Sequence, residues 1–227
     1  DYTVFDYQKD ARNCINKIID KGKIPILVGG TGLYIKSVLY DYKFNLENNK
    51  KETYDQYNNE ELYKKLLSID PKTEIHPNNR KRVERALDYY FANNKPISSK
   101  EKTNKILYDA IIIGLTTDRN ILYEKINERV DKMLESGLLD EAHRIYESGI
   151  RTKAVLTPIG YKELFPYFEG KENLDNAILL MKQNSRHYAK RQYTWFLHQI
   201  DVKWFTTNYD NFNQTIDDVV NYIAEVI

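Results

Sequence analysis

The chain has 227 residues, 41% of them hydrophobic and 30% charged, with a formal net charge of +1 at pH 7. This length allows one large domain or one domain with an insertion, and no apolar run approaches the ~18 residues of a membrane-spanning helix. A single cysteine excludes an intramolecular disulfide framework and a cysteine-cluster zinc site, and nothing resembles a signal peptide, so we expect a cytoplasmic protein with no membrane partner.

The first predicted elements are a helix over residues 6–21, a strand over 24–28 and a helix over 33–41. In a chain that alternates strands and helices, a first strand with its phosphate-binding loop usually precedes such a helix. Asp1 instead leads almost directly into the first helix. We therefore expect the sequence to lack an N-terminal part of its fold.

The connection between the strand and the second helix is rich in glycine. The apolar residues 24–28 are followed by Gly29, Gly30, Thr31 and Gly32. Such a turn places backbone N–H groups and a helix N-terminus at the carboxyl end of a sheet, which suits an anion or a polar substrate. The same turn can also reflect tight packing alone. It is not a Walker A loop, because Lys36 follows Ile35 rather than a glycine.

The rest of the chain reads mainly as helices. Residues 44–60 are polar and rich in asparagine, which predicts a loop. Helices follow at 60–69, 78–93, from 98 onward, and at 119–136, 138–148, 161–168 and 174–199, with strands at 107–115 and 204–205. Strands on both sides of a helical block predict the α/β class. Residues 1–45 and 107–227 would form the core with its C-terminal helices, and residues 46–106 a helical insertion.

The predicted helix 78–93 opens with basic residues. Residues 72–105 carry nine Lys and Arg against four Asp and Glu, and Arg82 and Arg85 share one helix face. A basic first turn opposes the helix dipole. Two interpretations stay open, which are a solvated charged face and a surface for the phosphate backbone of a nucleic acid.

Arg129 borders the apolar stripe of the predicted helix 119–136, between Ile126 and Met133. Arginine is rarely buried without a partner. The partner would be either an internal carboxylate or a bound phosphate, whose oxygens match the planar guanidinium.

The last long helix carries a second basic segment. Lys182, Arg186 and Lys190 follow at i, i+4 and i+8, and like charges at this spacing repel. An anion lying on the stripe would offset this cost, and interleaved aromatic residues favour RNA. Tyr188, Gln192 and Trp195 are expected to face the core.

Taken together, these segments resemble the tRNA dimethylallyltransferase family. The matching pieces, in order, are residues 6–11, 25–34 (PILVGGTGLY), 69–71, 76–78, 82–87, 126–129, 159–163 and 189–192 with Trp195. The resemblance implies transfer of a dimethylallyl group from dimethylallyl diphosphate to N6 of the adenine on the 3′ side of a tRNA anticodon. It also implies a P-loop-NTPase-like parallel-sheet core with an α-helical insertion domain, and we expect a monomer.

The resemblance also implies roles for individual residues. Thr31, near the reacting adenine, and Arg129, on the donor diphosphate, are the candidate catalytic residues. Substrate binding is expected of Gly29, Gly30, Gly32, Arg186 and Arg191. Binding of the tRNA anticodon arm is expected of Lys81, Arg82, Val83, Glu84, Arg85, Thr157, Pro158, Ile159, Gly160, Tyr161, Lys162 and Lys190.

Other parts of the machinery implied by the resemblance are expected outside this sequence. The reaction uses Mg²⁺, whose ligands would come mainly from a segment before Asp1 and from the diphosphate. The P-loop and the aspartate general base are expected in the same segment. Two alternatives stay open, which are a non-catalytic tRNA-binding fragment and a P-loop-type small-molecule kinase. A kinase explains the strand–glycine–helix unit but not two basic helices.

Overall fold

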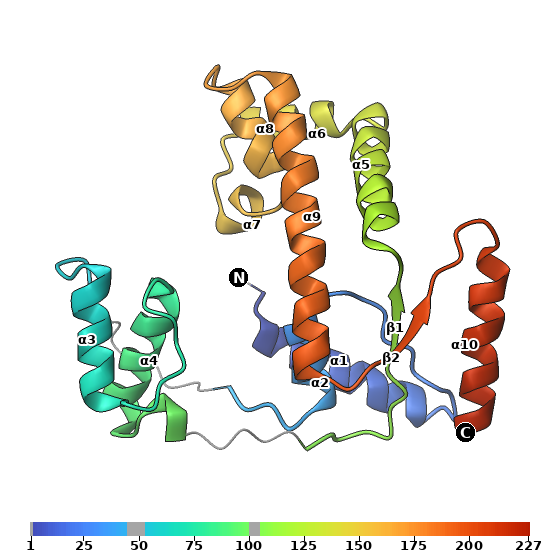
Figure 1. Ribbon diagram of the computed structural model, residues 1–227, viewed down its shortest axis with the longest axis horizontal. Coiled ribbons are helices and arrows are strands. Elements are labelled where there is room, and N and C mark those ends of the chain that lie inside the picture. Colours follow the sequence, from blue (N-terminus) through green and yellow to red (C-terminus); the bar gives the residue numbers. More distant parts are fainter. Residues whose placement is uncertain (1, 45–52, 100–104) are drawn as a thin grey trace. The chain divides into compact units, whose positions relative to one another are not determined.

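The computed structural model describes residues 2–44, 53–99 and 105–227 (Figure 1). The chain divides into two compact units, one formed by Asp1–Pro25 with Lys36–Tyr108 and the other by Ile26–Ile35 with Asp109–Ile227. The domain division expected from the sequence, with an insertion at 46–106, stays a prediction, and residues 45–52 of its expected loop lie outside the described ranges. Within those ranges no helix is both long and apolar enough to span a bilayer.

Helix α1 (Val4–Ile19) stabilises the end of helix α2 (Gly32–Leu39). The last carbonyl groups of a helix lack partners within it. Arg12 donates hydrogen bonds to the carbonyl oxygens of Ser37, Val38 and Tyr40 at 2.9, 3.1 and 2.7 Å. One turn earlier on α1, Gln8 donates to the Ser37 carbonyl at 2.6 Å. Two long side chains of α1 therefore cap α2.

Residues 24–28 do not form the strand that the sequence predicts. Ile24, Ile26 and Val28 are 79%, 83% and 87% exposed, although a core strand would bury them. A strand is stable only when a neighbour pairs its N–H and C=O groups. No strand of the described ranges pairs with this segment, so the apolar sequence alone does not make it regular.

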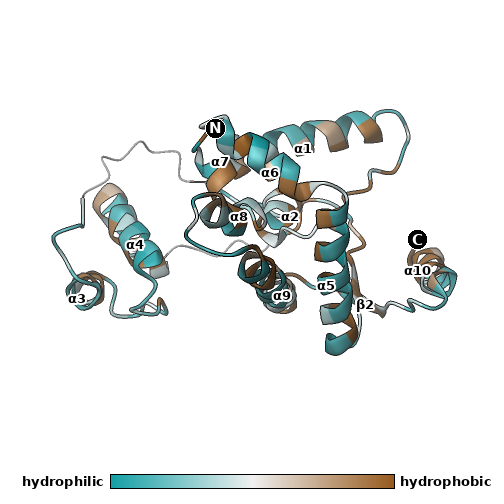
Figure 2. Cartoon of the chain, turned by 90° about the horizontal axis from the view of Figure 1, so that it is seen from above, coloured by the Kyte–Doolittle hydropathy of each residue, from teal (hydrophilic) through white to brown (hydrophobic). Residues whose placement is uncertain are grey.

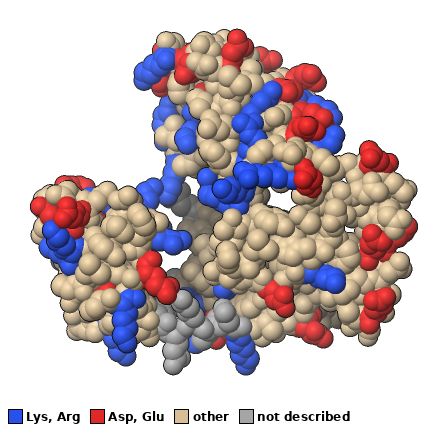
Figure 3. Space-filling model, viewed as in Figure 1, with Lys and Arg blue, Asp and Glu red and all other residues tan. Residues whose placement is uncertain are grey.

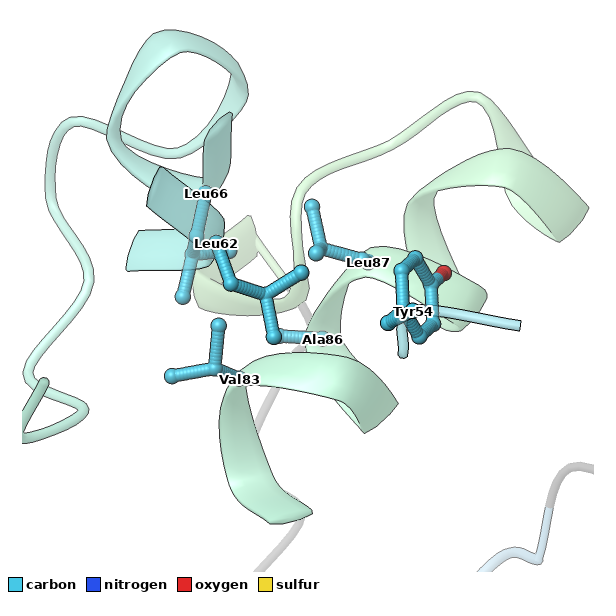
Figure 4. Close-up of a cluster of buried hydrophobic side chains, with 6 residues drawn as sticks. All are labelled: Tyr54, Leu62, Leu66, Val83, Ala86 and Leu87. Carbon is cyan, nitrogen blue, oxygen red and sulfur yellow. The ribbon is translucent and has the colours of Figure 1, made fainter. Parts of the chain in front are cut away.

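Helices α3 (Asn59–Ile69) and α4 (Arg80–Asn93) pack around a small core of their own. Asn58 and Glu61 form a capping box that starts α3. The helix ends before Pro71, where the buried carboxylate of Asp70 accepts hydrogen bonds from the N–H and hydroxyl groups of Ser98 in the 3₁₀ turn η1 (Ile97–Ser99). The core side chains, shown in Figure 4, are Tyr54, Leu62, Leu66, Val83, Ala86 and Leu87.

The second unit contains a parallel two-stranded sheet. Strand β1 (Ile113–Thr116) pairs with β2 (Lys203–Thr206), in the register Ile113 with Lys203 and Thr116 with Thr206. Parallel strands need a long crossover connection, which is helical here. The observed mixture of helices with a parallel sheet confirms the predicted α/β class.

The crossover runs through helices α5 to α9, and one helix follows β2. Their bounds are Arg119–Glu135 for α5, Leu138–Glu147 for α6, Lys153–Leu156 for α7, Tyr161–Phe168 for α8, Leu174–Gln199 for α9 and Phe212–Val226 for α10. The sequence did not predict α7 or α10. Five buried residues from four of the helices form the core, which are Val130, Ala142, Leu164, Ala177 and Met181. Figure 2 shows both apolar and polar residues along α5 and α9, as expected for helices with one buried face.

Candidate functional site

The glycine turn of the second unit lies against α9. Gln192 donates a hydrogen bond from Nε2 to the carbonyl oxygen of Gly30 at 2.8 Å. A Cβ atom added to Gly30 would lie 2.6 Å from this nitrogen, and one added to Gly32 would lie 2.0 Å from Cε3 of Trp195. Tight packing against α9 therefore explains these two glycines. Gly29 differs, because none of the described residues lies within 4 Å of a Cβ built there.

Thr31 stands between the two packed glycines and is exposed. Its carbonyl oxygen accepts hydrogen bonds from the N–H groups of Tyr34 and Ile35 at 3.0 and 3.2 Å, so its backbone belongs to the start of α2. Within the described ranges its hydroxyl group has no hydrogen-bond partner. The backbone of Thr31 is thus held, while its side chain is available to a substrate.

Helices α5 and α9 pack side by side and are joined by polar contacts. Lys182 forms an ion pair with Asp131 at 2.7 Å, and Arg186 donates a hydrogen bond to Oδ1 of Asn127, also at 2.7 Å. The guanidinium of Arg186 also lies 5.9 Å from the ring centre of Tyr123. The sequence predicts an anion beside the basic residues of this helix. For Lys182 that anion is Asp131 of the chain itself. The sequence had not singled out Asn127 or Asp131, although their i, i+4 spacing matches that of Lys182 and Arg186.

Further along α9, basic residues surround a pocket of about 450 Å³ lined by His187, Lys190, Arg191, Thr194 and Trp195. In Figure 3, Lys and Arg side chains gather over the middle of α9. Lys190 and Arg191 are exposed, and neither forms an ion pair within the described ranges. The expectation that Tyr188 faces the core is wrong, because it is 40% exposed and lies 5.7 Å from the guanidinium of Arg191. Gln192 and Trp195 are partly buried, against the glycine turn.

Arg129 is exposed on α5, next to the buried Val130. The sequence placed it at the border of the buried face, so this expectation is corrected. Among the residues that the structure describes, no carboxylate pairs with it and no group accepts a hydrogen bond from it. An internal carboxylate partner, one of the two interpretations left open, is therefore absent from the described ranges.

The turn before α8 is anchored by a buried carboxylate. Gly160 has a φ of +112°, a conformation that favours glycine. Its N–H donates to Oε2 of Glu163 at 2.8 Å, and Asn184 of α9 donates to Oε1 at 2.7 Å. Glu163 is only 4% exposed. This carboxylate therefore joins the turn to α9.

The other residues of the turn are more accessible. Thr157, Pro158 and Lys162 are exposed, and Ile159 is partly buried. The hydroxyl of Tyr161 donates a hydrogen bond to Glu141. That bond, together with weaker contributions from burial and the charge of Glu141, raises the pKa of Tyr161 above its ordinary value.

The basic start of α4 separates into structural and exposed residues. Arg80 donates to the carbonyl oxygens of Tyr54 and Tyr57 at 2.8 and 2.9 Å and forms an ion pair with Glu84 at 2.8 Å. Lys81, Arg82 and Arg85 are exposed, without an ion pair inside the described ranges. Val83, also expected to bind tRNA, is 0% exposed and packs in the core.

The described residues bring part of the predicted site together. The glycine turn, Arg186, Lys190 and Arg191 meet on or against α9, whereas Lys81–Arg85 belong to the other unit. In the described ranges no group of three or more His, Cys, Asp or Glu side chains could hold a metal ion.

The chain matches known proteins over most of its length. A family model described as IPP transferase matches residues 1–199. The chain is 44% identical to the tRNA dimethylallyltransferase of Anoxybacillus flavithermus over 230 residues, covering 98% of this chain and 74% of the relative. It is 47% identical to the Bacillus subtilis protein of the same name, covering 90% of this chain and 68% of the relative.

Solved structures agree with these relatives. A tRNA delta(2)-isopentenylpyrophosphate transferase from Staphylococcus epidermidis superposes with a TM-score of 0.69 at 37% identity, covering 100% of this chain and 78% of that one. A tRNA isopentenylpyrophosphate transferase from Bacillus halodurans gives 0.68 at 39% identity, with 99% and 73% covered. These likenesses confirm the predicted fold, a P-loop-like core with a helical insertion. The chain therefore belongs to the IPP transferase family.

Proposed function

We propose that this protein transfers a dimethylallyl group from dimethylallyl diphosphate to N6 of the adenine next to the anticodon in tRNA. The observation that carries the proposal is the identity of 44% over 98% of the chain to a tRNA dimethylallyltransferase. The protein is thus an enzyme, a prenyltransferase that modifies tRNA. Family membership does not favour a small-molecule kinase or a non-catalytic tRNA-binding module.

The transfer breaks the bond between the allylic carbon and the diphosphate oxygen, which keeps the electron pair. The same carbon forms a bond to N6, and a general base accepts the proton that leaves that nitrogen. Arg129 is suited to hold the departing diphosphate, because its guanidinium is exposed and has no partner in the described ranges. The hydroxyl of Thr31, which has no partner within the described ranges, would orient N6 toward the donor. The adenine must leave its stack to reach these groups.

Two surfaces would hold the tRNA. Lys81, Arg82 and Arg85 would contact phosphates of the anticodon arm, since all three are exposed and unpaired where the structure describes the chain. Lys190, beside the pocket on α9, would hold RNA near the glycine turn, and Arg191 beside the same pocket would bind the substrate. The exposed residues of the turn 157–162 would add contacts to the tRNA. Val83 is buried, so it would support tRNA binding only by packing in the core between α3 and α4.

Several expectations from the sequence remain predictions. Mg²⁺, dimethylallyl diphosphate as the donor, a monomeric state and a cytoplasmic location are among them. When bound, Mg²⁺ would neutralise charge on the diphosphate. Since the described ranges contain no cluster of metal-ligating side chains, we assign no residue to this ion.

The test measures transfer with the full-length gene product that carries this sequence. The protein is incubated with Mg²⁺, labelled dimethylallyl diphosphate and a tRNA transcript, and label in the RNA is counted. A transcript with guanine in place of the adenine next to the anticodon is the matched control. We expect label only in the adenine transcript. No label in either transcript, or equal label in both, would contradict the proposal.

A further inference from the structure

Two side chains of α9 hold the glycine turn from one helix face. Gln192 and Trp195 are three residues apart, a spacing that places both on the same side of a helix. Gln192 bonds to the carbonyl group of Gly30, and the indole of Trp195 lies directly against Gly32. The contacts are therefore made to the two residues that flank Thr31.

Holding these neighbours restricts Thr31. Glycine has the greatest conformational freedom of any residue, so a turn with three glycines in four positions would otherwise sample many conformations. Within the described ranges, the side chain of Thr31 has no bond of its own that would fix the turn. Its position thus depends on the backbone on either side, and that backbone is held by α9.

Trp195 has a second environment. Besides packing on Gly32, it lines the pocket on α9 together with Lys190 and Arg191. A molecule in this pocket therefore touches a side chain that also contacts the glycine turn. One helix carries both the basic residues suited to RNA and the two groups that hold the Thr31 backbone.

We propose that Gln192 and Trp195 are positioning residues, which hold the Gly30–Gly32 backbone so that the Thr31 hydroxyl meets the reacting adenine. This inference rests on the proposed function, because it assigns Thr31 a part in the transfer. Neither side chain touches the reacting atoms. Loss of the Gln192 side chain would misplace Thr31 by a small distance without removing any residue that lines the pocket on α9.

The first test replaces Gln192 with leucine in the full-length protein. A misplacement near 1 Å can lower a rate about 100-fold, so we expect kcat to fall between about 10- and 100-fold. The KM values for tRNA and for the donor should stay within about twofold, because binding groups are retained. Gln183→Leu is the matched control. It makes the same change on an exposed face of α9, at a residue whose side chain makes no hydrogen bond in the described ranges, and should leave both constants unchanged.

A double-mutant cycle tests whether the effect passes through the turn. Gly30→Ala places a methyl group where the Gln192 amide lies and should also lower kcat. Because both changes disrupt one contact, the Gly30→Ala/Gln192→Ala protein should be no slower than Gln192→Ala alone. Independent effects that multiply would overturn the proposal.

Amide hydrogen exchange provides a readout that does not need activity. In Gln192→Leu, the peptide covering residues 29–34 should exchange faster, while peptides from α5 and α8 stay unchanged. Unchanged exchange in that peptide, or an unchanged kcat in a protein that does modify tRNA, overturns the inference alone. No transfer by the unsubstituted protein overturns the proposed function as well.

Discussion

The basic start of α4 and the basic stretch of α9 have similar sequence patterns, but their charged side chains contact different groups. Among the basic residues at the start of α4, Arg80 bonds to carbonyl groups of its own unit, whereas Lys81, Arg82 and Arg85 are exposed and form no ion pair within the described ranges. On α9 Lys182 and Arg186 have partners on α5, and the accessible cations come later, at Lys190 and Arg191. A charge pattern therefore locates a basic helix but does not distinguish structural cations from ligand-binding ones. Partners in the fold make that distinction.

Arg129, an exposed cation without a partner in the described ranges, should give the largest effect. Arg129→Ala should lower kcat/KM about 100- to 1,000-fold, as expected when one group that stabilises developing charge is removed. Thermal unfolding should be unchanged, since no described contact is lost. Steady-state kinetics and a melting curve on the full-length protein check both. Unchanged kinetics with a lowered Tm would make Arg129 structural.

Two exposed cations of α4 should act on RNA affinity. Arg82→Ala with Arg85→Ala should weaken tRNA binding about 10- to 100-fold and flatten its dependence on salt, because fewer counterions are released. Filter binding at two salt concentrations measures this. If affinity and salt slope both stay at the unsubstituted level, the surface is not used for RNA.

Arg80, on the same helix, should behave in the opposite way. Arg80→Met keeps the aliphatic stem but loses two bonds to carbonyl groups and the ion pair with Glu84. We expect the free energy of unfolding to fall by about 1–3 kcal/mol. Urea denaturation measures it, and tRNA affinity at low temperature should change less than twofold. A large loss of affinity without loss of stability would remove the contrast between Arg80 and its neighbours.

The matched pair on α9 is Lys182 and Lys190. Lys190→Ala should weaken tRNA binding several-fold, whereas Lys182→Ala should leave it unchanged and cost less than about 1 kcal/mol of stability, as is usual for partly exposed ion pairs. Binding and denaturation of both variants decide between the two roles. Equal effects on tRNA binding would show that the ion pair with Asp131 does not prevent Lys182 from binding RNA.

The smallest predicted effect concerns alkaline pH. The hydrogen bond to Glu141 raises the pKa of Tyr161 in the folded state above its unfolded value of 10.0. The protonated phenol therefore stabilises the fold fully below pH 10, and this contribution is lost as pH rises through the folded pKa. Tyr161→Phe should lose less stability between about pH 9 and pH 12 than the unsubstituted protein. The other tyrosines titrate in both proteins, so only the difference between the two curves of unfolding free energy against pH reports on Tyr161. Curves that stay parallel over this range would contradict the prediction.

Local signals predicted much of the helical structure. The ranges 161–168 and 174–199 match α8 and α9 to the residue, because Gly160 and the asparagine cap at 173 mark where these helices begin. The strand at 24–28 failed, since pairing with another strand is not a local property. The exposure of Arg129 was missed for a similar reason. The spacing of apolar residues on one helix does not show how much of that helix the neighbouring helices cover.

The sequence identifies the segments of the candidate site but not the contacts between them. The motif 25–34 and the basic stretch of α9 were both recognised, yet nothing in either segment shows that Gln192 reaches Gly30. The ion pair of Lys182 with Asp131 was likewise hidden, although both helices were predicted. Such contacts depend on how helices pack, and that is decided by the whole core.

The separation of these contacts along the chain has a consequence for synthesis. Ile113 pairs with a residue 90 positions later, and the Gly30 carbonyl is bound by a residue 162 positions later. At about 5–20 residues per second, a ribosome would complete α9 between roughly 8 and 32 s after making the glycine turn. During this time the nascent turn lacks the hydrogen bond from Gln192. The glycine turn is therefore synthesised well before the residue that fixes its final shape.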